Sequence, residues 1–125
     1  MAKYGDCAVQ AANEAAISGD PITAWNRAAA SLFGESRTAR EKGCPKSTFL
    51  GLCEAGLVAG VKPGPYTRSI DNKAYGLKAV ERLRQNSSLS DDPKRLWAEI
   101  MEGITKAENS QMEVVIALWR SSKIV

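Results

Sequence analysis

The sequence predicts an all-α fold: a compact bundle of five or six short helices that forms a single domain over residues 1–125. Apolar residues recur at three- and four-residue spacing in each of these segments, which is the periodicity of helices that bury one face. Two Asp-Pro pairs, at 20–21 and 92–93, each place an N-cap residue before a first-turn proline. No segment shows a convincing strand pattern.

The first two helices are predicted before residue 34. The first has a narrow apolar face made largely of small side chains, namely Tyr4, Cys7, Ala8, Ala11 and Ala15. The second begins after the Asp20 cap and ends before Gly34, with an apolar stripe of Ile22, Trp25, Ala29, Leu32 and Phe33.

The middle of the chain predicts a third helix and a long connector. The polar, mainly basic stretch 36–42 fits either a short solvated helix or a loop. A helix follows Gly43 with Pro45 in its first turn, Gly56 placed to end it, and an apolar face of Phe49, Leu52, Cys53 and Leu57. The stretch 60–69 is too rich in proline and glycine for regular structure, so we expect an extended connector there.

Three helices are predicted in the last part of the chain. The fourth is capped by Asp71 or Asn72 and carries Ala74, Leu77, Val80 and Leu83, with a loop at 86–88. The fifth follows Asp92 and carries Leu96, Trp97, Ile100, Met101 and Ile104. The sixth begins at a Ser110–Glu113 capping box and carries Met112, Val115, Ile116 and Trp119. The predicted core is Trp25, Phe33, Phe49, Leu52, Leu77, Leu83, Trp97, Ile100 and Trp119.

Several function classes are disfavoured by residues that the sequence lacks. It contains no histidine, which removes Ser-His and Cys-His nucleophile pairs and the commonest metal ligand. Its three cysteines show no Cys-x-x-Cys spacing, so we expect reduced thiols, no structural metal and no cofactor. There is no apolar run of the length that spans a membrane and no secretion signal at the start. We therefore expect a cytoplasmic protein without a membrane partner.

The basic middle of the chain is the main candidate for binding. Residues 36–84 contain ten basic and four acidic side chains, a net charge of +6 in a chain whose total is +3. We therefore predict a non-enzymatic interaction protein whose middle meets an unidentified protein or another anionic partner, nucleic acid included. The favoured contacts are Lys46, Tyr66, Arg68 and Lys73.

Two alternatives remain open at this point. In the first, residues 36–58 form a helix-turn-helix-like element in which Lys46, Ser47 and Thr48 contact DNA, which requires residues 36–42 to be helical. In the second, the chain is an enzyme with a reactive Cys44, because flanking lysines and a helix N-terminus favour a thiolate. Without histidine, such a thiol needs another base.

Residues 44–84 carry a resemblance to known proteins. The motifs are Cys44-Pro45-Lys46-Ser47, Pro65-Tyr66-Thr67-Arg68-Ser69 and Asn72-Lys73-Ala74-Tyr75. This stretch resembles an uncharacterised family of small bacterial proteins of unknown function. The resemblance implies a bacterial, cytoplasmic origin, and it implies no activity, substrate or catalytic residue.

Overall fold

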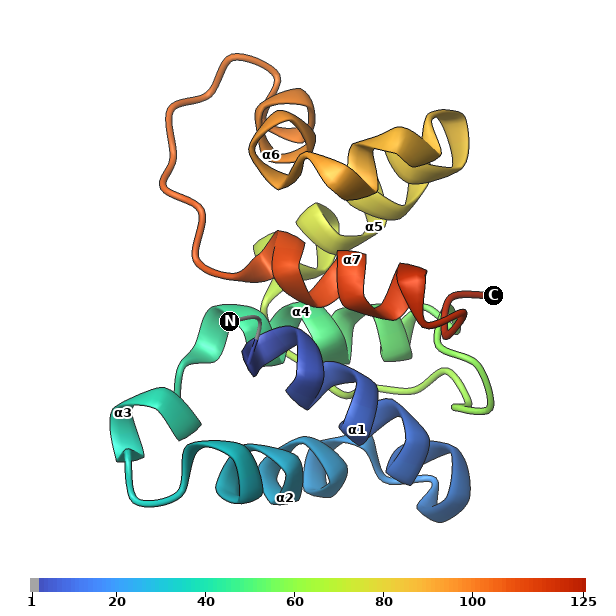
Figure 1. Cartoon of the computed structure of the whole chain (residues 1–125). Coiled ribbons are helices and arrows are strands. Elements are labelled where there is room, and N and C mark those ends of the chain that lie inside the picture. Colours follow the sequence, from blue (N-terminus) through green and yellow to red (C-terminus); the bar gives the residue numbers. More distant parts are fainter. Residues whose placement is uncertain (1–2) are drawn as a thin grey trace.

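A computed structural model, which describes residues 3–125, shows an all-α bundle (Figure 1). Six α-helices have nine residues or more, as predicted: α1 (Lys3–Ser18), α2 (Pro21–Phe33), α4 (Gly43–Glu54), α5 (Ile70–Gln85), α6 (Pro93–Met101) and α7 (Gln111–Arg120). A single turn, α3 (Arg37–Arg40), and a 3-10 helix, η1 (Ser87–Asp91), complete the helical structure. Within residues 3–125 there is no strand, only an isolated antiparallel bridge between Val58 and Ile124.

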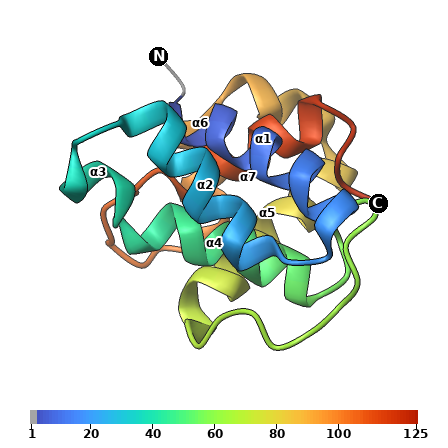
Figure 2. The same ribbon diagram turned by 90° about the horizontal axis from the view of Figure 1, so that it is seen from below.

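The helices lie in three tiers. The α1–α2 hairpin occupies one end, α4 and α7 lie across the middle, and α5 with α6 form the other end (Figure 1). Helix α4 is central because it contacts α1, α2, α5 and α7. The connector that follows it runs along the edge of the molecule to the start of α5 (Figure 2). None of the helices in residues 3–125 is both long enough and apolar enough to span a membrane.

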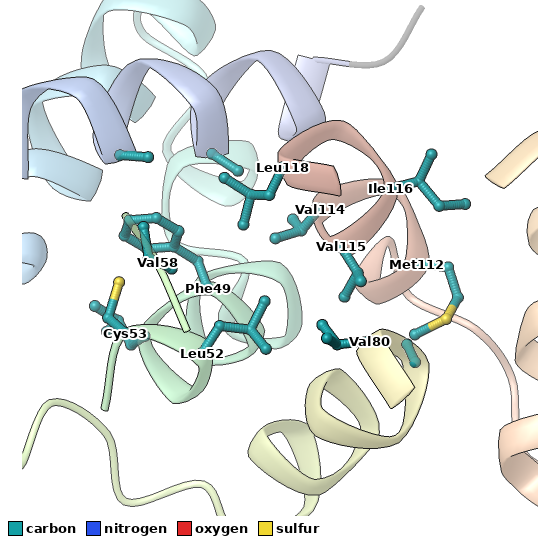
Figure 3. Close-up of a cluster of buried hydrophobic side chains, with 14 of the residues drawn as sticks. Phe49, Leu52, Cys53, Val58, Val80, Met112, Val114, Val115, Ile116 and Leu118 are labelled. Atoms are coloured by element: carbon teal, nitrogen blue, oxygen red, sulfur yellow. The ribbon is translucent and has the colours of Figure 1, made fainter. Parts of the chain in front are cut away.

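The core fills the space between α1, α4, α5 and α7 (Figure 3). Phe49 and Leu52 of α4 are fully buried together with Val80 of α5 and Leu118 of α7. Trp25 of α2 packs on Phe49 with ring centroids 5.4 Å apart. Side chains of this size each contribute about 1.5–3 kcal/mol on burial. Of the predicted core residues, three are only partly buried and pack against the cluster: Phe33, Leu77 and Trp119.

The start of α5 and the segment after it differ from the prediction. The Ser69 hydroxyl accepts the N–H of Asn72, so Ser69 caps the helix, and the predicted Asp71 or Asn72 cap was wrong. A loop was expected at 86–88, but residues 87 and 88 belong to the 3-10 helix η1, and Asn86 is its N-cap. Serine, aspartate and asparagine all serve as N-caps, so the residue types alone do not decide between them.

The end of α6 and the start of α7 also differ from the prediction. Helix α6 ends at Met101, and Ile104, predicted to lie on its apolar stripe, is 70% exposed in the following loop. The predicted Ser110–Glu113 capping box does not form, because Ser110 has φ 70° and its side chain makes no cap hydrogen bond. A different side chain caps the start of α7: Oε2 of Glu108 accepts the N–H of Met112 at 2.9 Å.

Candidate functional site

Two of the predicted binding residues meet at a carboxylate that the sequence analysis missed. Glu54, the last residue of α4, accepts the backbone N–H groups of Tyr66 (2.9 Å) and Thr67 (3.2 Å) through Oε1. Its Oε2 accepts the Lys73 ammonium group at 2.7 Å. Glu54 therefore fastens the connector to α4 and α5 at once. No spacing rule links position 54 to positions 66, 67 and 73, so the sequence alone carries no signal for this contact.

The electrostatics of Glu54 follow from these hydrogen bonds. The bond from Lys73, and then those from the N–H groups of Thr67 and Tyr66, hold the pKa of the Glu54 carboxyl below its usual value. The carboxylate is thus charged at neutral pH and offsets the positive charge of Lys73. Of the basic residues favoured by the sequence, Lys73 is therefore already paired within the chain.

A close helix approach places these groups. A β-carbon at Gly51 would lie 2.7 Å from Cα of Lys73, and one at Gly76 would lie 3.3 Å from Thr48 Cγ2. Gly51 therefore allows the backbone of α4 to meet the backbone of α5 at Lys73, and Gly76 allows α4 side chains to pack closely on the backbone of α5. This packing brings the start of α5 beside the end of α4.

A hollow of about 320 Å³ opens at this junction. We call it the α4–α5 corner, and its lining residues are Glu54, Thr67, Ser69, Ile70, Lys73, Ala74 and Leu77. Ile70 is 82% exposed, and Ala74 and Leu77 follow it at positions i+4 and i+7 on the same face of α5. The corner therefore combines an ion pair with an apolar strip in which Ile70 is exposed and Ala74 and Leu77 are half-buried.

The remaining connector residues play unequal parts. The Tyr66 hydroxyl donates to the Lys62 carbonyl at 2.7 Å, and its ring lies against Gly64, so this tyrosine serves the shape of the connector. Arg68 is exposed, and it forms no ion pair with any residue in 3–125. It therefore presents a free positive charge beside the corner.

The other predicted contacts, Lys46, Ser47 and Thr48, lie in the first half of α4. Thr48 is fully buried and its hydroxyl donates to the Cys44 carbonyl at 2.8 Å, so it is not available to DNA. Lys46 and Ser47 are half-buried. The helix that must precede a recognition helix is the single turn α3, and most of α4 is buried in the core.

Cys44, the candidate nucleophile, is half-buried in the first turn of α4. The other two cysteines, Cys7 and Cys53, are buried in the core, and burial raises the pKa of each thiol to about 12. No group of three or more metal-ligating side chains occurs among residues 3–125.

Fold and surface together define a small helical-bundle protein with a preformed corner between two close-packed helices. The model of a family of unknown function, DUF6979, matches residues 1–125, and the chain belongs to this family. The resemblance seen in residues 44–84 thus extends over the whole chain. Neither the curated proteins nor the solved structures include a match to it.

Proposed function

We propose that this chain is a non-enzymatic interaction protein whose α4–α5 corner binds an acidic, amphipathic segment of a partner protein. The observation that carries the proposal is the apolar strip that begins at Ile70, a large side chain left 82% exposed. An exposed apolar strip beside a hollow, with polar groups at its rim, is typical of protein interaction sites.

Charge selects the partner. Arg68 precedes the strip by two residues and Lys78 follows Ala74 by one turn of α5. Both are exposed, and neither forms an ion pair within residues 3–125. Unpaired cations on both ends of an apolar strip complement a helix with leucines on one face and carboxylates at its flanks.

The corner is also held in shape before a partner arrives. Glu54 fixes the backbone at Tyr66 and Thr67, and Ser69 caps α5. Ordering a ten-residue connector on binding would oppose association, and the hydrogen bonds of Glu54 remove part of that cost in advance.

A labelled peptide tests the proposal. The probe is a fluorescein-labelled helical peptide with leucines at i, i+4 and i+7 and glutamates beside them, and fluorescence anisotropy measures its binding. Ile70→Ser is expected to weaken binding at least about tenfold. Ile17→Ser is the matched control, because Ile17 is 90% exposed on a different helix, α1.

The peptide with lysine in place of glutamate supplies the test of charge. We expect it to bind more weakly than the acidic peptide. In the Arg68→Ala variant, the difference between the affinities of the two peptides is expected to be smaller. Equal binding of the acidic peptide to the Ile70→Ser and Ile17→Ser variants would refute the proposal.

A second candidate function, contact with nucleic acid, is favoured by a different hollow. Arg40 and Lys46, with Asn26 and Glu41, line a polar hollow of about 380 Å³ between α2, α3 and α4. Two neighbouring cations suit phosphate contact, and such binding weakens steeply as salt increases. Titration of short single- and double-stranded DNA and RNA at low and physiological salt tests this, with Lys46→Ala as the variant and Lys94→Ala on α6 as the control.

A further inference from the structure

A second concave surface is lined by residues of η1, α6, α7 and the segment 102–110. Figure 1 shows this segment joining α6 to α7. It consists of two adjoining hollows of about 460 and 370 Å³ that share Pro93 and Glu108. These volumes fall within the range of about 300–1,000 Å³ that is usual for small-ligand sites. We call the two hollows together the α6–α7 groove.

The smaller hollow has a rigid aromatic wall. Trp97 lines it, and the indole N–H already donates to the Lys106 carbonyl at 2.8 Å. Tyr75 packs edge-on against the Trp97 ring, with centroids 5.3 Å apart and planes at 73°. Both contacts hold the ring in place. Trp97 is 8% exposed, and this exposed part offers a ligand a small, fixed apolar surface.

The larger hollow carries two carboxylates that no cation in residues 3–125 neutralises, those of Glu108 and Glu113. One oxygen of each is fixed at 2.9 Å from a backbone N–H, that of Met112 for Glu108 and that of Gly5 for Glu113. The second oxygen of each forms no hydrogen bond within residues 3–125.

The other charges of the groove limit where a cation fits. Asp91 and Arg120 both line the larger hollow, and they form an ion pair with each other, so the charge of each is offset. Lys94 lines the smaller hollow and repels a cation there. A positive group therefore belongs beside Glu108 and Glu113, away from the Trp97 wall.

We propose that the α6–α7 groove binds a small organic cation, a primary ammonium group carried on an apolar or aromatic stem. The ammonium group donates to the free oxygens of Glu108 and Glu113, and the stem packs against Trp97 and Pro93. The inference is independent of the α4–α5 corner, because the two surfaces share no residue.

The test compares three phenylalkyl probes whose end groups are positive, neutral and negative, respectively: 3-phenylpropylamine, 3-phenylpropanol and 3-phenylpropionate. Two-dimensional ¹H–¹⁵N NMR follows the Trp97 indole N–H and the amides of the groove. The amine is expected to bind about tenfold more tightly than the alcohol, and the carboxylate most weakly. Equal affinities for amine and alcohol, or no shift of the Trp97 signal, would overturn the proposal.

Two isosteric variants locate the charge. Glu108→Gln and Glu113→Gln keep an oxygen that accepts the same backbone N–H, and each is expected to weaken amine binding about fivefold while leaving the alcohol unchanged. Glu81→Gln, on the exposed face of α5, is the matched control. Unchanged amine affinity in both groove variants overturns the assignment. If either variant fails to fold, the affinity of the wild-type chain for the amine is measured as salt concentration increases. Amine binding that does not weaken with salt also overturns the assignment of the charge to Glu108 and Glu113.

A fourth probe separates a free amine from a protein side chain. Nα-acetyl-lysine amide carries the same ammonium group on an aliphatic stem, with two amide groups that must lose water against the apolar wall. We expect it to bind more weakly than 3-phenylpropylamine. Tighter binding of the lysine derivative would overturn the assignment to a small free cation.

Discussion

Replacing Gly51 with alanine tests the close helix approach on which the α4–α5 corner depends. A β-carbon at position 51 would lie 2.7 Å from both Cα and Cβ of Lys73, whereas ordinary contact begins at 3.4 Å. The backbone of Lys73 cannot rotate away, so α4 and α5 must separate by about 0.7 Å, the difference between these distances. That movement also pulls Lys73 from Glu54.

The magnitude follows from two opposing effects. Over-packing costs about 1–3 kcal/mol, and alanine is about 1 kcal/mol better than glycine inside a helix. Because the β-carbon meets backbone at 2.7 Å, we expect an over-packing cost in the upper half of that range, so that Gly51→Ala lowers the free energy of unfolding by about 1–2 kcal/mol. Each kcal/mol corresponds to a fall in melting temperature of about 3–5 °C. The assay is urea unfolding followed by far-ultraviolet circular dichroism.

Gly43→Ala is the control, because a β-carbon at the first residue of α4 meets nothing within 4 Å. This variant is expected to be as stable as the wild type or more stable, by up to about 1 kcal/mol. If Gly51→Ala proves as stable as Gly43→Ala, the close approach of the two helices is refuted.

Three further predictions concern single buried or paired groups. Because the folded-state pKa of Glu54 is lowered, its stabilisation is present above the unfolded pKa of about 4.3 and is lost as the pH falls through the folded value. The wild type should therefore lose more unfolding free energy than Glu54→Gln between about pH 5 and 3, and parallel urea-unfolding profiles would contradict this. The indole N–H of Trp25 is buried without an acceptor among residues 3–125. Trp25→Phe therefore removes an unpaired donor, whose burial costs about 1–3 kcal/mol, and should leave the unfolding free energy within about 1 kcal/mol of wild type. A loss above about 3 kcal/mol in urea unfolding would show that the N–H is hydrogen-bonded. Cys7 and Cys53 are buried with pKa values raised to about 12, so a chromogenic disulfide reagent should label only Cys44 in the native chain at pH 8, and prompt labelling of all three thiols would contradict their burial.

The helices were predictable where local chemistry and burial agree. Asp20 and Asp92 accept the N–H groups of Thr23 and Arg95, each at 3.1 Å, as the Asp-Pro pairs predict. These caps need no distant partner, because the accepting and donating groups lie three residues apart. The same holds for the apolar stripes of α4 and α7, whose spacing identifies residues on the buried face. In α2 the prediction was wrong at Ile22, which is 38% exposed, because the buried face is formed by Trp25 together with the small residues Ala24, Ala28 and Ala29.

Some predictions failed where a side chain forms a hydrogen bond with a residue distant in the sequence and not with the local partner that its spacing predicts. Glu113 has the right spacing for a capping box with Ser110, but its carboxylate accepts the N–H of Gly5, 108 residues away. This tertiary contact overrides a local preference. At the start of α5, by contrast, the cap is local, because the Ser69 hydroxyl accepts the N–H of Asn72. The prediction was wrong there because serine, aspartate and asparagine all serve as N-caps.

The same limit applies to charge, and it bears on how a partner is recognised. A sequence gives the net charge of a segment but not which of its cations are paired, and the basic middle loses Lys73 to Glu54 and Arg82 to Glu99 and Glu102. Beside the α4–α5 corner, Arg68 and Lys78 form no ion pair with any residue from 3 to 125. Two exposed charges supply little affinity at physiological salt, because solvent and ions screen them. Binding there must therefore draw its strength from the apolar strip that begins at Ile70, while the cations set the orientation and choice of partner. Ile70→Ser should accordingly weaken peptide binding at every salt concentration, whereas Arg68→Ala should do so mainly at low salt.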